Sequence, residues 1–182
     1  FSGWQNIGKF TKAQSFDEFH CADEFSDDSG NAWGCSDAAL FKQIEAYMSK
    51  EKEQEKVFHV VLTTTNHPPY SIDVDGMGFQ RAKVKSKLPA DIASDEKTLT
   101  ELGHIWYADK TMGDFVKQAQ SMYSDTLFVI TGDHSERFSF AKEQDTRTLS
   151  SIPCIFVQQA WFNDKSVGNH MQLAGTLAEL LA

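Results

Sequence analysis

The stretch Thr126-Leu127-Phe128-Val129-Ile130-Thr131-Gly132-Asp133-His134-Ser135 says more about the fold than any other part of this sequence. Its first six residues are β-branched, aromatic or aliphatic, which is typical of a buried strand. Gly132 then allows the chain to break sharply. Asp133 and His134 follow at the carboxyl end of the strand, which is the edge where open α/β sheets place their ligands. A carboxylate and an imidazole on adjacent residues suit a divalent metal of the Zn or Mn type, whereas a polar turn that only caps the strand is the alternative interpretation.

Apolar strands and amphipathic helices alternate along the chain, which is typical of a mostly parallel sheet covered by helices. We therefore predict an α/β fold, a three-layer sandwich with a mostly parallel sheet. The predicted strands are Phe16–Phe19, Val57–Leu62, Thr126–Thr131 and Ile152–Val157, and the last three are expected in one sheet. The predicted helices start at Asp37 behind a Ser36 cap, run from about Asp95 to Met122, and start again at about Gln172. In the last helix we expect Leu173, Leu177 and Leu180 to pack against the sheet.

Length and charge narrow the range of functions. A chain of 182 residues is expected to form a single domain over residues 1–182, or a large part of one. The formal net charge of −9 argues against a nucleic-acid partner, which would require a basic surface. A phosphate-bearing small substrate stays possible, because a bound cation reverses the local field.

A second polar turn follows the predicted strand at Val57–Leu62. Its sequence is Thr64-Thr65-Asn66-His67-Pro68-Pro69-Tyr70, and it opens a long irregular stretch from Asn66 to Ala93. If both strands lie in one parallel sheet, His67 lies on the same edge as Asp133 and His134. We therefore predict that His67 and His134 open onto one pocket, although a lone turn histidine that caps its strand is the simpler interpretation.

The three cysteines show no paired spacing that is typical of a metal site. Cys154 lies within a predicted strand and is expected to be a buried, small apolar residue. Cys21 and Cys35 flank an acidic loop, and they are expected either to form a disulfide in an oxidising compartment or to remain two free thiols.

Four segments together resemble a known family. Asn66–Tyr70, Tyr107–Phe115 and Asp125–His134 are similar to three blocks of the lipoteichoic acid synthase type of sulfatase-like proteins, in the alkaline phosphatase superfamily. Trp33–Phe41 resembles a fourth block, the Trp-Gly-x-x-Asp segment of that family. The four blocks occur in the family's order over nearly the whole chain. The family includes bacterial phosphoglycerol transferases.

The resemblance implies a mechanism and a set of site residues. A threonine attacks the phosphorus of a lipid head-group phosphodiester, and a divalent metal, usually Mn with Zn or Mg as alternatives, activates it. By similarity Asp133 and His134 are metal ligands, and His67 is a catalytic and substrate-binding residue that contacts a phosphate oxygen or relays the leaving-group proton. Trp4 matches a substrate-binding tryptophan, although Asn6 stands where the family has an arginine. The parent protein is expected to be membrane-anchored upstream of this chain, with the domain at the extracytoplasmic face of a bacterial membrane.

The family's nucleophile and remaining acidic metal ligand are expected upstream of Phe1, so that this chain alone is expected to be inactive. The sulfatase signature Cys-x-Pro-x-Arg does not occur in the sequence. Three functions stay open at this point: a phosphoglycerol transferase, a sulfatase or phosphoethanolamine transferase of the same superfamily, and a non-catalytic envelope binding domain.

Overall fold

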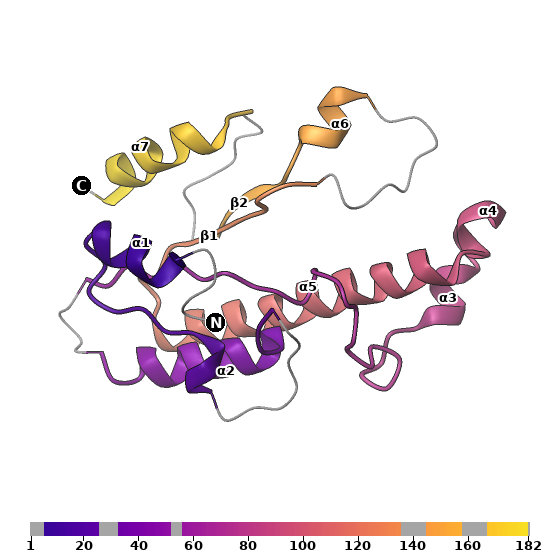
Figure 1. Cartoon of the computed structure of the whole chain (residues 1–182), viewed down its shortest axis with the longest axis horizontal. Helices are drawn as coiled ribbons and strands as arrows, with labels where there is room; N and C mark the ends of the chain where they lie inside the picture. The colour runs from indigo at the N-terminus through magenta and orange to yellow at the C-terminus, as the bar shows by residue number, and fades with distance from the viewer. Residues whose placement is uncertain (1–5, 26–32, 52–55, 136–144, 158–166, 182) are drawn as a thin grey trace.

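The computed structural model describes residues 6–25, 33–51, 56–135, 145–157 and 167–181. The helices and strands within them are α1 (Ile7–Ala13), η2 (Ala22–Glu24), α2 (Asp37–Met48), α3 (Arg81–Lys85), α4 (Ala90–Ala93), α5 (Glu96–Met122), β1 (Phe128–Thr131), α6 (Thr146–Ser150), β2 (Cys154–Val157) and α7 (His170–Leu181). Figure 1 shows α5 as the long axis of the molecule, with α2 beside one end and α3 and α4 at the other. Among the described residues, none of the helices contains an apolar stretch of the length that a membrane span requires.

The α2–α5 contact contains the larger core, and the sequence predicted both helices. Ser36 caps α2 as expected, because its Oγ accepts a hydrogen bond from the Ala39 backbone N–H at 3.3 Å. Helix α5 begins one residue after the predicted start and ends at the predicted Met122. The two helices bury a continuous apolar cluster formed by Phe41, Ile44, Met48, Phe115, Val116 and Ala119. Their apolar faces recur at helical spacing, which is why the sequence pattern was sufficient here.

Strands β1 and β2 form a two-stranded antiparallel sheet, with Phe128 opposite Val157 and Thr131 opposite Cys154. The sheet lies between α7 and the α2–α5 pair in Figure 1. Phe128 and Ile130 of β1 pack against the α2–α5 core, together with Val157 of β2. The two predicted strands therefore exist, each shorter than expected. The predicted mostly parallel sheet is not confirmed, since the one strand pair in the described residues is antiparallel. The sequence could not give the direction, because a continuous apolar run looks the same in a parallel and in an antiparallel strand.

Two other strand predictions are wrong for the described residues. Val57–Leu62 is extended chain outside the sheet, and its side chains are exposed, with Val60 at 66% and Leu62 at 62%. The apolar run indicated a buried strand, but a strand assignment also needs a hydrogen-bonded neighbour, and no described segment provides one. Phe16–Phe19 is irregular. Cys154, expected to be buried, is exposed on β2, and no disulfide joins Cys21, Cys35 or Cys154.

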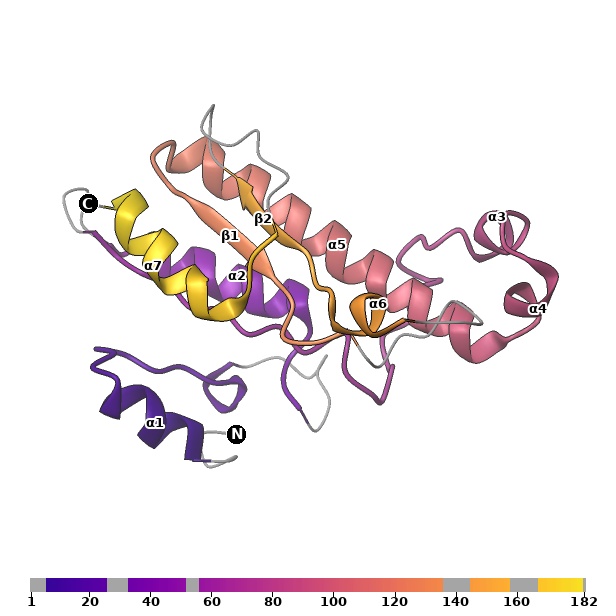
Figure 2. The same ribbon diagram turned by 90° about the horizontal axis from the view of Figure 1, so that it is seen from above.

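The long stretch from Asn66 to Ala93 folds onto the other half of α5. It contains α3 and α4 and packs Val74 and Phe79 against Tyr107 of α5. His104, only 1% exposed, is fully hydrogen-bonded: its Nε2 accepts from the Ile72 N–H at 3.1 Å and its Nδ1 donates to the Thr100 carbonyl at 2.9 Å. This histidine therefore attaches the stretch to the helix. Figure 2 shows α3 and α4 gathered at that end of α5.

Helix α7 begins at His170, two residues before the predicted start. Leu173, Leu177 and Leu180 are its least exposed described residues, which agrees with the predicted packing face. Asn169 and Gln172 form a reciprocal cap at its start: the Gln172 side chain accepts from the Asn169 N–H at 2.9 Å, and the Asn169 side chain accepts from the Gln172 N–H at 3.3 Å.

Candidate functional site

The end of β1 presents Asp133 and His134 to solvent. Oδ1 of Asp133 accepts the backbone N–H of His134 at 2.9 Å, which fixes the turn, and Oδ2 lies 3.6 Å from Nε2 of the same histidine. The Asp133 side chain is 78% exposed and that of His134 is 38% exposed. From α7, Nε2 of His170 donates to the Gly132 carbonyl at 2.9 Å and attaches this turn to the helix. Both predicted metal ligands are therefore held on a turn that is supported from two elements.

The spacing of these two groups is compatible with one metal ion. Two ligands that each lie about 2.1 Å from an ion at a near-tetrahedral angle are separated by about 3.4 Å. The Oδ2–Nε2 distance of 3.6 Å is close to that value. A site of this kind needs three or four protein ligands, and no group of three or more His, Cys, Asp or Glu side chains with metal-binding geometry occurs among the described residues. Asp133 and His134 thus fit as part of a ligand shell.

His67 lies in the turn that follows the extended segment at residues 57–64. Its backbone N–H donates to the Thr64 carbonyl at 3.0 Å, and its Nδ1 lies 2.7 Å from the Pro68 carbonyl oxygen. A carbonyl oxygen can only accept, so Nδ1 carries the proton in this contact. In the neutral ring Nε2 is then an acceptor. No hydrogen bond from another described residue reaches Nε2.

Trp33 holds the imidazole of His67 in place. The two ring centroids are 3.9 Å apart with the planes inclined at 45°. Trp33 is part of the Trp33–Phe41 block, but sequence reasoning assigned it no role, because nothing local shows that it contacts a residue 34 positions later. The tryptophan that the sequence did single out, Trp4, lies outside the described residues. Trp33 is therefore an aromatic group at this site that sequence reasoning missed.

The predicted site has two parts in the structure, and each part has its own internal contact. Asp133 contacts His134, and His67 contacts Trp33. Among the described residues, no hydrogen bond, ion pair or ring contact joins His67 to Asp133 or His134. The expectation that His67 and His134 open onto one pocket stays a prediction.

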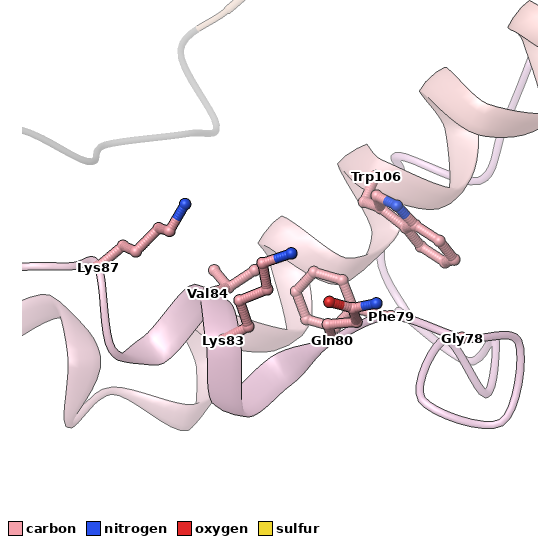
Figure 3. A pocket seen from close by; sticks show the side chains of 7 residues that line it. All are labelled: Gly78, Phe79, Gln80, Lys83, Val84, Lys87 and Trp106. Atoms are coloured by element: carbon pink, nitrogen blue, oxygen red, sulfur yellow. The ribbon is translucent and has the colours of Figure 1, made fainter.

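A separate hollow lies beside α3. It has a volume of about 390 Å³ and is lined by Gly78, Phe79, Gln80, Lys83, Val84, Lys87 and Trp106. Figure 3 shows the two lysine amino groups on one side and the Trp106 indole on the other. The rings of Phe79 and Trp106 lie 5.7 Å apart and form an apolar wall. None of the predicted site residues lines this hollow, so it is not part of the candidate site.

Comparison with known proteins assigns the family. The sulfatase family model matches residues 1–181. A lipoteichoic acid synthase of Staphylococcus saprophyticus is 27% identical over 143 residues, which are 76% of this chain and 19% of that protein. The crystal structure of the lipoteichoic acid synthase LtaP from Listeria monocytogenes matches with a TM-score of 0.68 at 20% identity, covering 90% of this chain and 42% of the solved chain.

The likeness to LtaP shows the fold, which is α/β. The chain spans about a fifth of the length of the Staphylococcus saprophyticus relative. The order of the sequence blocks, the family model and the solved structure all lead to the same assignment. This chain therefore belongs to the sulfatase family and, within it, is similar to the lipoteichoic acid synthases.

Proposed function

We propose that this chain is part of a metal-dependent phosphoglycerol transferase that acts on lipid-linked phosphodiesters at the extracytoplasmic face of a bacterial membrane. The observation that carries the proposal is the Asp133–His134 pair at the end of β1, whose 3.6 Å spacing suits two ligands of one divalent ion. Membership of the sulfatase family and the similarity to a lipoteichoic acid synthase support it. The substrate is then a glycerophosphate head group.

Each described site residue has a role in this proposal. Asp133 and His134 hold the metal, Mn²⁺ for preference, with Zn²⁺ or Mg²⁺ as alternatives. When bound, such an ion neutralises phosphate charge and acts as a Lewis acid. His67 presents Nε2 to a phosphate oxygen or to the leaving-group oxygen, while its Nδ1 stays bonded to the Pro68 carbonyl at 2.7 Å. Trp33 restricts rotation of that imidazole by packing on its face.

The metal part of the proposal is tested by calorimetric titration with Mn²⁺. The 182-residue chain should bind weakly, because two ligands are fewer than the three or four that a tight site needs. The protein encoded by the complete reading frame should bind tightly and in a 1:1 ratio, and Asp133→Ala should remove that binding. Tight binding by the 182-residue chain would contradict the partial ligand shell, and tight binding by the Asp133→Ala protein would contradict the assignment of the ligand.

The activity is tested with the same full-length protein on phosphatidylglycerol vesicles containing Mn²⁺, with release of diacylglycerol as the readout. We expect Asp133→Ala and His134→Ala to abolish release, and His67→Ala to slow it by about 10²–10⁴-fold, the usual contribution of a general acid or base. Asp125→Asn is the matched control, because this exposed carboxylate lies before β1 instead of after it and should leave the rate unchanged.

Three outcomes would contradict this function. Turnover of an aryl sulfate without turnover of phosphatidylglycerol would indicate a sulfatase. Transfer from phosphatidylethanolamine alone would indicate a phosphoethanolamine transferase. The absence of turnover on all of these substrates, in a protein that is folded and loaded with metal, would indicate a binding domain.

A further inference from the structure

Asp37, at the start of α2, is a buried carboxylate to which neither the metal nor the acid–base chemistry assigns a role. Asp37 is only 1% exposed to solvent. One side-chain oxygen, Oδ1, accepts two backbone N–H groups, from Thr64 at 3.2 Å and from Thr65 at 3.1 Å. The Asp37 N–H in turn donates to the Thr65 hydroxyl at 3.1 Å. Three hydrogen bonds therefore join this one residue to a segment that lies 27 and 28 positions later in the chain.

The segment that Asp37 holds is the one that delivers His67. Thr64 and Thr65 are the residues at which the extended chain turns, and the Thr64 carbonyl accepts the His67 N–H at 3.0 Å. The other end of the block that contains Asp37 also reaches this turn, because Trp33 packs on the His67 ring at 3.9 Å. Residues 33–37 therefore contact the turn both at its backbone, through Asp37, and at the imidazole, through Trp33.

The intervening Gly34 fits this close approach. A Cβ at position 34 would lie 3.1 Å from Oγ1 of Thr64, closer than nine in ten contacts of real Cβ atoms. The absence of a side chain at Gly34 therefore lets residues 33–37 lie against the turn.

Asp37 is also anchored on its far side. The neighbouring Ala38 N–H donates to the Tyr107 hydroxyl of α5 at 3.4 Å, so the start of α2 is fixed to the central helix. The second carboxylate oxygen, Oδ2, is buried and has no hydrogen-bond partner among the described residues. A buried polar atom without a partner is unfavourable, so Asp37 is a costly way to stabilise the fold. The effect of this carboxylate that can offset the cost is that it fixes the positions of the Thr64 and Thr65 amides.

We propose that Asp37 is a positioning residue for His67, acting through the Thr64 and Thr65 amides to set the imidazole against Trp33. Asp37 does not touch the substrate. This inference rests on the proposed function only for its consequence in catalysis, because the placement of His67 can be measured without any activity.

The structural test uses NMR spectroscopy of the 182-residue chain. At 3.9 Å from Trp33, the ring protons of His67 should show a ring-current shift, and the Thr64 and Thr65 amides should be protected from exchange. Asp37→Ala should abolish the shift. Asp37→Asn supplies a neutral acceptor of the same shape, so protection of the two amides should fall about tenfold, as expected when a charged hydrogen bond becomes a neutral one.

The matched control is Glu101→Gln, which neutralises another buried carboxylate. Glu101 pairs with Lys97 on α5 at 3.7 Å, and within the described part of the chain no hydrogen bond or ion pair connects it to the turn. The variant should leave the His67 shift and both amides unchanged. Circular dichroism melts show which variants are folded, and all spectra are recorded well below the lowest melting temperature. If Asp37→Ala does not fold, Asp37→Asn alone decides.

Two results would overturn the inference. One is a folded Asp37→Ala chain whose His67 ring shift is unchanged. The other is an Asp37→Asn chain whose Thr64 and Thr65 exchange stays within about twofold of wild type, since loss of the charge should weaken both bonds.

In the full-length protein, Asp37→Asn should lower kcat and leave KM nearly unchanged, because the imidazole is misplaced while other substrate contacts remain. The two proposals can fail separately. If the wild-type protein shows no turnover but the Asp37 variants still move His67, the proposed function is wrong and the positioning role of Asp37 remains.

Discussion

Replacement of Gly103 by alanine tests how closely the stretch from Asn66 to Ala93 packs on α5. Gly103 lies inside that helix, two turns after its start, and is buried. A Cβ at this position would lie 2.6 Å from Cγ2 of Val74 and 3.2 Å from Cδ1 of Phe79. Val74 is 2% exposed and Phe79 is 6% exposed, so neither side chain has open space into which it can move. The stretch must shift away from the helix if the methyl group is to fit.

Two opposing free-energy terms set the size of the effect. Alanine is favoured over glycine inside a helix by about 0.8–1 kcal/mol. Overpacking of a well-packed core costs about 1–3 kcal/mol, and a 2.6 Å approach to an enclosed methyl group belongs near the upper end of that range. Gly103→Ala should therefore lower the free energy of unfolding by about 1–2 kcal/mol, which corresponds to a fall in Tm of roughly 2–8 °C for a domain of this size.

Gly113→Ala is the matched control, because it makes the same change in the same helix at a position where, among the described residues, no atom outside the local helix backbone and the two neighbouring residues lies within 4 Å of the new Cβ. Only the helix-propensity term then applies, and the free energy of unfolding should rise by about 0.8–1 kcal/mol. Urea denaturation followed by far-UV circular dichroism measures both variants against the wild type. If Gly103→Ala stabilises the chain as much as Gly113→Ala does, Val74 and Phe79 are not held against α5 and the packing argument is wrong.

Two further predictions concern stability. Hydrogen bonds to Glu24, and to a smaller extent to Glu18, raise the pKa of His20 above its ordinary 6.5. Protonated His20 therefore stabilises the fold fully below about pH 6.5, and this stabilisation is lost as the pH rises through the raised pKa. Denaturation curves recorded across that window should show the loss in the wild type and not in His20→Gln, and an equal pH dependence in both would contradict this assignment. Gln172→Ala removes the side chain that accepts the Asn169 N–H at the start of α7. We expect denaturation to show a free energy of unfolding lower by about 0.5–1 kcal/mol, with no effect on turnover. Loss of turnover in a folded protein would show that Gln172 has a catalytic role.

Local patterns in the sequence were sufficient to predict several elements of this protein. The Ser36 cap and the helical spacing of Phe41, Ile44 and Met48 define α2 within a dozen residues of chain. The same holds for α5 and for the apolar run that becomes β1, because hydrophobic period and capping are properties of neighbouring residues. The Asp133–His134 pair was also found this way, since both residues are adjacent and follow a strand directly.

Which segments contact one another could be seen only in the folded chain. The apolar run of β1 predicts a strand, but it predicts neither that β2 is the neighbouring strand nor that the two strands are antiparallel. The run at Val57–Leu62 looked like a strand, yet it is not paired with any described segment, because a ladder depends on a partner that the run itself does not specify.

The same reason applies to the candidate site. Trp33 reaches His67 across 34 positions, and Asp37 reaches Thr64 and Thr65 across 27 and 28. Contacts of that range are formed by chain closure between separate elements, and no periodicity in the sequence records them. Sequence therefore identified the groups that can carry out chemistry, and tertiary structure identified the residues that hold one of them in place.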